Sequence, residues 1–141
     1  MLIFICFIMF LPAEILYLDG NKLHGTIPRE LGILHSLIGI DLRHNELTGT
    51  IPTEIGNWRG LEGLWLSENN LEGNIPSEIG KLSKLQYFPA NDNFLEGSIP
   101  IELFQCNKLV ELVLYENYLS GTISTLIGNL NKLQERKCVN T

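Results

Sequence analysis

The side chains that could carry catalysis are few and do not share a spacing. Three histidines, His24, His35 and His44, are scattered along the chain. His44 follows Asp41 and Arg43 closely, but no serine or cysteine recurs near it as an activated nucleophile would require. The sequence also lacks a glycine-rich phosphate loop and a kinase catalytic motif. The chain is therefore predicted to be non-enzymatic and to need no cofactor.

The cysteines do not predict a metal site or a disulfide. Cys6, Cys106 and Cys138 have neither the CxxC nor the cysteine–histidine spacing of zinc ligands. Cys106 occupies a position where the sequence elsewhere has leucine or tryptophan, so we expect a buried small apolar side chain. Cys138 is expected two strand spacings away on a different wall, too far for a bond between them.

The charge balance excludes one large class of partner. The chain has 16 acidic and 10 basic residues, which gives a net charge of −6. A nucleic-acid-binding domain usually needs a basic surface, so nucleic acid is not expected as the main partner. An acidic surface favours a ligand that has basic groups.

Most of the sequence repeats itself with a period of 24 residues. Leucines, glycines and Ile-Pro pairs return at fixed offsets through five full copies, and a sixth copy begins at Leu133. A fixed period of this size indicates a solenoid, in which each repeat completes a core that it cannot bury alone. One asparagine also returns in every copy, as Asn21, Asn45, Asn69, Asn93 and Asn117.

The third copy, residues 61–84, shows how one repeat should fold. Its first residues alternate, so Leu64 and Leu66 should point inward while Trp65 and Ser67 point outward. Asn69 can satisfy backbone groups at the bend that follows, and stacked copies would form an asparagine ladder inside the core. The segment 77–82 is expected to return as a short 3-10 turn.

The pattern LxxLxLxxNxL followed by GxIPxxIGxL resembles plant-type leucine-rich-repeat proteins, among them receptor-like kinase ectodomains and polygalacturonase-inhibiting proteins. The resemblance covers about 120 residues. It implies a right-handed leucine-rich-repeat solenoid of the β/α type, with one parallel strand per 24-residue coil and a mostly irregular or 3-10 convex side. The expected organisation is an apolar leader at 1–12, five repeats at 13–132 and a truncated sixth repeat at 133–141.

The outward positions of the strands form the candidate binding surface, which is acidic and aromatic. Exposed aromatic residues are preferred anchors at interfaces, and Trp65 is the strongest single candidate because it is large and central. An ordinary solvated sheet would also explain these side chains. The candidate ligand-binding residues are Tyr17, Asp41, Arg43, Trp65, Ser67, Glu68, Tyr87, Asp92, Glu111, Val113 and Tyr115.

A second acidic row recurs on the opposite side of the predicted solenoid. Like charges stacked at a constant spacing are slightly destabilising. Sequence drift or pairing with lysine explains this row better than a metal site. Its members are Glu30, Glu54, Glu78 and Glu102.

The leader, Met1 to Leu11, is uncharged and apolar. It is shorter than the roughly 20 apolar residues that cross a bilayer, and its length is that of a signal-peptide apolar region. Three interpretations stay open: a secretion signal, an accidental start on a truncated reading frame, or a hydrophobic lid on the first coil. Neither end has a cysteine pair like those that cap plant extracellular relatives, so the open ends could cause self-association.

The resemblance implies recognition of a protein or peptide ligand, which the acidic face suggests is basic. A larger receptor kinase ectodomain is a second possible partner, because small co-receptor ectodomains of this family pair with larger receptors. Two alternatives remain: an enzyme inhibitor, or the ectodomain fragment of a receptor-like kinase without its kinase domain. All three favour a secreted or cell-surface location over a cytoplasmic one.

Overall fold

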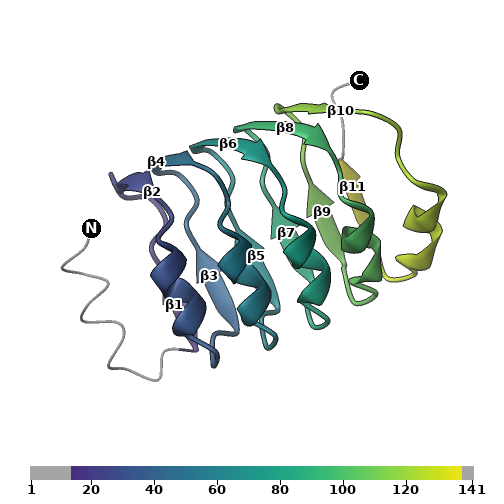
Figure 1. Cartoon of the computed structure of the whole chain (residues 1–141), viewed down its shortest axis with the longest axis horizontal. Helices are drawn as coiled ribbons and strands as arrows, with labels where there is room; N and C mark the ends of the chain where they lie inside the picture. Colours follow the sequence, from purple (N-terminus) through teal and green to yellow (C-terminus); the bar gives the residue numbers. More distant parts are fainter. Residues whose placement is uncertain (1–13, 138–141) are drawn as a thin grey trace.

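The computed structural model of the chain describes residues 14–137. The predictions made for the leader at 1–12, for Cys6 and for Cys138 fall outside the described residues. From residue 14 onward the chain winds through successive coils of the same shape, stacked side by side (Figure 1). No helix within 14–137 has the length and apolar content that crossing a membrane requires.

A parallel sheet of six short strands lines one wall of the solenoid. Consecutive coils pair in register, so that Ile40 aligns with Leu64 and Phe88 with Leu112. These residues point inward, as the alternation predicted. In sheet order the strands are β1 (Ile15–Tyr17), β3 (Gly39–Asp41), β5 (Gly63–Trp65), β7 (Tyr87–Pro89), β9 (Glu111–Val113) and β11 (Glu135–Lys137).

Each coil then forms a second strand, so the expectation of one strand per coil was incomplete. The second strand also alternates, with a buried leucine between exposed polar residues, as in Glu46, Leu47 and Thr48. A glycine with positive φ, such as Gly73 at 71°, bends the chain near its end. The second sheet contains β2 (His24–Thr26), β4 (Glu46–Gly49), β6 (Asn70–Asn74), β8 (Phe94–Ser98) and β10 (Tyr118–Ser120).

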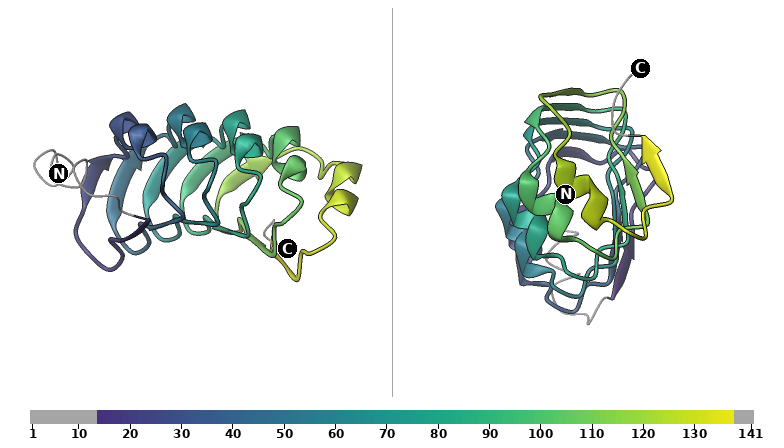
Figure 2. Two further views of the ribbon diagram at one scale, coloured as in Figure 1. Left: turned by 90° about the horizontal axis from the view of Figure 1, so that it is seen from below. Right: turned by 90° about the vertical axis from the view of Figure 1, so that its right-hand side faces the viewer.

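The return segments are 3-10 helices, as predicted. Seen along the solenoid, they lie on the side opposite the first sheet, and the second sheet joins the two sides (Figure 2). A proline precedes each of the first four helices with φ between −63° and −70°, which matches the angle that its ring imposes. The helices are η1 (Arg29–Ile33), η2 (Thr53–Asn57), η3 (Ser77–Lys81), η4 (Ile101–Gln105) and η5 (Thr125–Asn129).

The last return helix stands apart from the row, and the sequence gives a reason (Figure 2). In earlier coils a glycine faces the next helix: a Cβ on Gly80 would lie 2.6 Å from the backbone oxygen of Glu102. Phe104 takes this glycine position in η4, and a benzyl side chain cannot fit into that space. Accordingly η5 has no buried residue, and a Cβ on its Gly128 would meet nothing within 4 Å.

The asparagine ladder is confirmed. The amide of Asn69 donates to the carbonyl oxygens of Leu42, Leu66 and Ser67 at 2.9, 3.1 and 3.3 Å. Its Oδ1 accepts from the backbone N–H of Leu47 at 3.1 Å. Each inner asparagine thus ties its own coil to the preceding one. Asn21 has no described coil before it, is exposed and, among residues 14–137, bonds to Leu18 and Asp19 of its own repeat.

The fourth repeat departs from its neighbours in the first sheet. Pro89 ends β7, and because proline has no backbone N–H it cannot donate to the preceding strand. The β5–β7 register contains one residue pair, Gly63 with Tyr87, whereas β3–β5 contains three. Ala90 follows as a fully buried residue where other coils have leucine.

Candidate functional site

The strand face is the outward surface of the first sheet together with the residues that directly follow its strands. Its central feature is an aromatic pair. Trp65 in β5 and Tyr87 in β7 have ring centroids 6.0 Å apart and planes inclined by 17°. Both side chains are half-buried. Stacked aromatic pairs contribute more than the area that they bury, and aromatic residues are enriched at interfaces.

Glycines in the sheet allow the tryptophan ring to lie flat. A Cβ placed on Gly63 would lie 1.9 Å from Cη2 of Trp65, so no larger residue fits beneath the ring in this position. A Cβ on Gly39 in the neighbouring strand would lie 3.4 Å from the same ring. Sequence reasoning singled out Trp65 but missed the role of these two glycines. Their recurrence at the same repeat position, two residues before Asp41 and Trp65, was the available signal.

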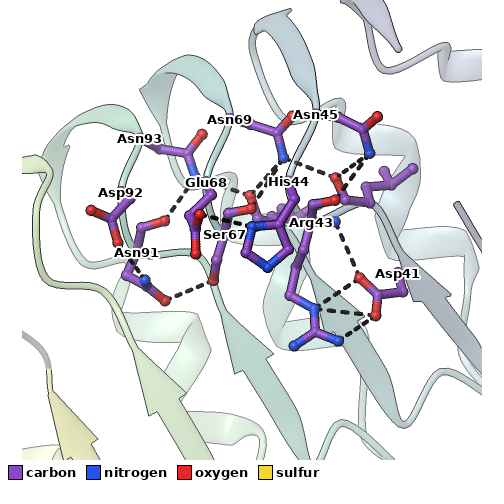
Figure 3. A network of polar contacts seen from close by, with 12 residues as sticks. Asp41, Arg43, His44, Asn45, Ser67, Glu68, Asn69, Asn91, Asp92 and Asn93 are labelled. Atoms are coloured by element: carbon purple, nitrogen blue, oxygen red, sulfur yellow. Dashed lines mark hydrogen bonds and ion pairs between the residues drawn. The ribbon is translucent and has the colours of Figure 1, made fainter. Parts of the chain in front are cut away.

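An ion pair lies beside the aromatic pair. The Nε of Arg43 donates to both carboxylate oxygens of Asp41, at 2.9 and 3.1 Å, and Nη2 also contacts that carboxylate (Figure 3). Asp41 is only 3% exposed. Hydrogen bonding to Asp41 is the main reason that the pKa of Arg43 is raised. This pair is therefore a fixed unit in which the guanidinium is the more accessible partner.

The residues that follow the strands share an unusual backbone conformation. His44, Glu68, Asp92 and Glu116 have φ between 50° and 56°, and Gly20 at the same repeat position has 64°. Few residues other than glycine adopt this left-handed region. Because the conformation recurs, these side chains form one row along the edge of the strand face. Gly20 was the one hint of it in the sequence.

Two members of this row contact each other. The Nδ1 of His44 lies 2.7 Å from Oε2 of Glu68, and both side chains are about half exposed. Farther along, the hydroxyl of Ser67 donates to Oδ1 of Asn91 at 2.7 Å. The amide of Asn91 in turn donates to Asp92 at 2.6 Å (Figure 3). These contacts join neighbouring coils into one polar network.

The structure distributes the predicted site residues over three environments. Asp41, Ser67 and Val113 are almost fully buried, so they cannot contact a ligand directly. They can affect binding only through the neighbouring side chains that they hold in place. Arg43, Trp65, Tyr87, Asp92, Glu111 and Tyr115 are half-buried, and Tyr17 and Glu68 are exposed. Asn91 was not among the predicted residues, although it connects two of them.

Nothing in the described part of the chain offers a metal centre, since no group of three or more potential metal ligands gathers there. The glutamates on the return helices bond locally instead: Glu54 accepts from Thr53 and Glu78 from Ser77, both at 3.3 Å. Cys106 is fully buried with its Sγ 3.3 Å from the carbonyl oxygen of Ile79, and burial raises its thiol pKa to about 11. The prediction of a buried, small apolar cysteine is confirmed.

Comparison with known protein families agrees with this architecture. The leucine-rich-repeat family matches residues 13–34, 36–58, 60–82 and 108–130, which is more than half of the chain. The chain belongs to the leucine-rich-repeat family. The matches omit residues 83–107, which contain most of the divergent fourth repeat with Pro89 and Phe104. A search of curated protein sequences finds no significant match.

Solved structures of plant receptors are similar to this leucine-rich-repeat chain. The plant peptide hormone receptor RGFR1, in complex with RGF2, shares 40% identity over 89% of the chain, with a TM-score of 0.88. The ectodomain of the membrane receptor kinase GASSHO1/SCHENGEN3 from Arabidopsis thaliana, in complex with CASPARIAN STRIP INTEGRITY FACTOR 2, shares 36% over 90%, with 0.87.

The Arabidopsis receptor kinase HAESA, in complex with the peptide hormone IDA and the co-receptor SERK1, shares 35% identity over 86% of the chain, with a TM-score of 0.81. The present chain spans only 20%, 15% and 21% of the length of the RGFR1, GASSHO1/SCHENGEN3 and HAESA chains, respectively. The shared fold therefore concerns a short part of much longer chains.

Proposed function

We propose that this chain is a receptor-like recognition module that binds a peptide or protein ligand on its strand face. The observation that carries the proposal is the stacked Trp65–Tyr87 pair, which lies on a glycine-lined sheet beside the Asp41–Arg43 ion pair. A rigid aromatic platform with fixed charges nearby is the usual composition of an interface hot spot.

The similar structures support a peptide as the ligand. RGFR1 and GASSHO1/SCHENGEN3 are each in complex with a named factor, and HAESA is in complex with a peptide hormone and a co-receptor. We extend to this chain a peptide ligand, partnership with a larger receptor kinase ectodomain and a cell-surface or secreted location. An ectodomain fragment of a receptor-like kinase fits the same matches, and sequencing the transcript downstream would test it directly.

Ligand capture tests the proposal. The purified chain is immobilised and exposed to secreted plant peptides, to receptor kinase ectodomains and to cell-wall hydrolases, each in a separate arm. We expect saturable binding in the peptide arm or the ectodomain arm, and loss of that binding in Trp65→Ala. Arg29→Ala on the return side is the matched control, because Arg29 is exposed and far from the strand face. Binding only to hydrolases would favour the inhibitor alternative, and no saturable binding in any arm would contradict the proposal.

A further inference from the structure

A hollow of about 330 Å³ lies at the edge of the strand face, between the ends of the first-sheet strands and the start of the second sheet. We call it the rim hollow and define it by Asp92, Asn93, Phe94, Glu116, Asn117 and Tyr118, which line it. Phe94 begins β8 and Tyr118 begins β10. The rim hollow is therefore separate from Trp65 and Tyr87, which belong to the first sheet.

The aromatic side chains of the rim hollow form a second stacked pair. The ring centroids of Phe94 and Tyr118 are 6.0 Å apart, and their planes are inclined by 17°. The two residues are 47% and 67% exposed, so their rings remain open to a ligand. In a folded chain, large aromatic residues this exposed and this ordered relative to each other are a feature of binding surfaces.

The polar groups of the hollow favour a hydrogen-bond donor as the ligand. The side-chain amides of Asn93 and Asn117 already donate to backbone carbonyls, three bonds each. Since these amides are fully used, they offer an anion no N–H group. What the hollow offers a ligand is the carboxylate of Asp92 and the negative faces of the two aromatic rings.

The carboxylates sit at consecutive places in the left-handed row. Asp92 has φ 55° and Glu116 has φ 50°, so the recurring backbone conformation sets both side chains along one edge, one coil apart. Asp92 accepts one bond from Asn91, and its carboxylate has room for more donors. The carboxylate of Asp92, next to two exposed rings, attracts a cation.

We propose that the rim hollow is a subsite for a positively charged side chain, arginine above all, of the ligand that the strand face binds. Arginine fits better than lysine because its planar guanidinium can stack on a ring while donating to a carboxylate in the same plane. The subsite deepens the proposed function and rests on it. It adds a second contact region, which selects ligands that have a basic residue.

The test uses small probes and the full chain. N-acetyl-L-arginine amide is titrated into the isotope-labelled protein at pH 7, and amide chemical shifts are followed by NMR. We expect saturable shifts at residues 92–95 and 116–119 and in the side-chain amides of Asn93 and Asn117. N-acetyl-L-citrulline amide, which has nearly the same shape without the charge, should bind at least about threefold more weakly.

Variants separate a specific subsite from general attraction to an acidic protein. Asp92→Asn should weaken arginine amide binding severalfold while keeping the fold, because asparagine tolerates the left-handed conformation. Phe94→Leu with Tyr118→Leu should abolish saturation. Glu30→Gln removes one negative charge from the return side and should leave the titration unchanged. If the leucine double variant fails to fold, Asp92→Asn and the citrulline probe still show whether the rim hollow is a specific subsite.

The result that overturns the proposal is equal response to arginine and citrulline amides, or shifts confined to Trp65 and Tyr87, or no shifts at the rim hollow. Its failure is distinguishable from failure of the proposed function. A captured ligand that binds through Trp65 with no arginine amide response at the rim would remove the subsite and keep the function. If arginine amide shifts the rim hollow but the capture experiment finds no ligand in any arm, the proposed function fails. The rim hollow would then bind only an isolated cationic side chain.

Discussion

Single residues determine how the coils join and how the strand face is shaped. The asparagine at the bend supplies the side-chain hydrogen bonds that replace backbone pairing where strands end. Glycines set how closely neighbouring groups approach, both under Trp65 and between return helices. Where the sequence changes one of these residues, the local structure changes with it, as Phe104 shows beside η5.

Replacing one ladder asparagine should be costly. Asn69→Ala removes three donated bonds and one accepted bond, and leaves buried backbone groups of Leu42, Leu66 and Leu47 without these partners. Buried unsatisfied polar groups cost about 1–3 kcal/mol each, so we expect the free energy of unfolding in urea to fall by at least about 2 kcal/mol. Asn21→Ala is the control, because its bonds are exposed and local, and should cost under about 1 kcal/mol. Equal losses would show that the ladder is not what couples the coils.

Gly63→Ala should displace the tryptophan platform without unfolding the chain. The new methyl group would occupy the space of the Trp65 ring, while the backbone of Gly63 needs no positive φ. The ring can rotate outward, so we expect red-shifted fluorescence from Trp65 and a nearly unchanged urea midpoint. Trp58 is buried in the core and should contribute a constant signal, which Trp65→Phe isolates. Unchanged emission would mean that the ring does not lie over Gly63.

At the scale of elements, the sequence predicts the inward positions, the 3-10 returns and the ladder because each depends on one residue type at one repeat position. It predicts less well what depends on neighbouring coils. The second strand per coil arises from pairing between successive segments such as β4 and β6. The left-handed row has glycine only at Gly20, so its other members had no distinctive residue. Likewise, Ser67 was expected to face outward but is buried, and its hydroxyl donates to Asn91 of the next coil.

The fourth repeat should be the weakest internal coil. Pro89 removes one backbone hydrogen-bond donor from the pairing of β5 with β7. Ala90 fills less of the core than the leucine of other coils. A buried leucine-to-alanine difference is worth about 2–5 kcal/mol. Backbone amides of residues 87–90 should therefore exchange with deuterium faster than those of residues 63–66. Equal protection of the two strands would refute this ranking.

At the scale of the whole molecule, the solenoid ends differ from its middle. Ile123 and Leu126 near η5, and Ile15 and Tyr17 in β1, are exposed. By contrast, Ile27, Ile51 and Ile75, at the repeat position of Ile123, are buried. Exposed apolar side chains of this kind promote association. The described part of the chain therefore has a well-packed centre and one loosely packed last coil.

Self-association should depend on the exposed residues of that last coil. We expect sedimentation to show a mass that rises with concentration, and Ile123→Ser with Leu126→Ser to reduce the rise. Because both side chains are already exposed, the substitutions should change the unfolding midpoint little. Ile33→Ser, at an exposed residue of the first return helix, is the control for surface hydrophobicity alone. A concentration-independent monomer mass with cooperative unfolding would contradict this expectation.

The central claim is that the strand face recognises the ligand through its aromatic platform. The direct measurement is the dissociation constant of the captured ligand for the wild-type chain, for Trp65→Ala and for Arg29→Ala, under one set of conditions. We predict at least about tenfold weaker binding for Trp65→Ala, as for an aromatic hot-spot residue, and no change for Arg29→Ala. If the affinity of Trp65→Ala stays within a factor of about two of the wild-type affinity, the assignment of the site is contradicted.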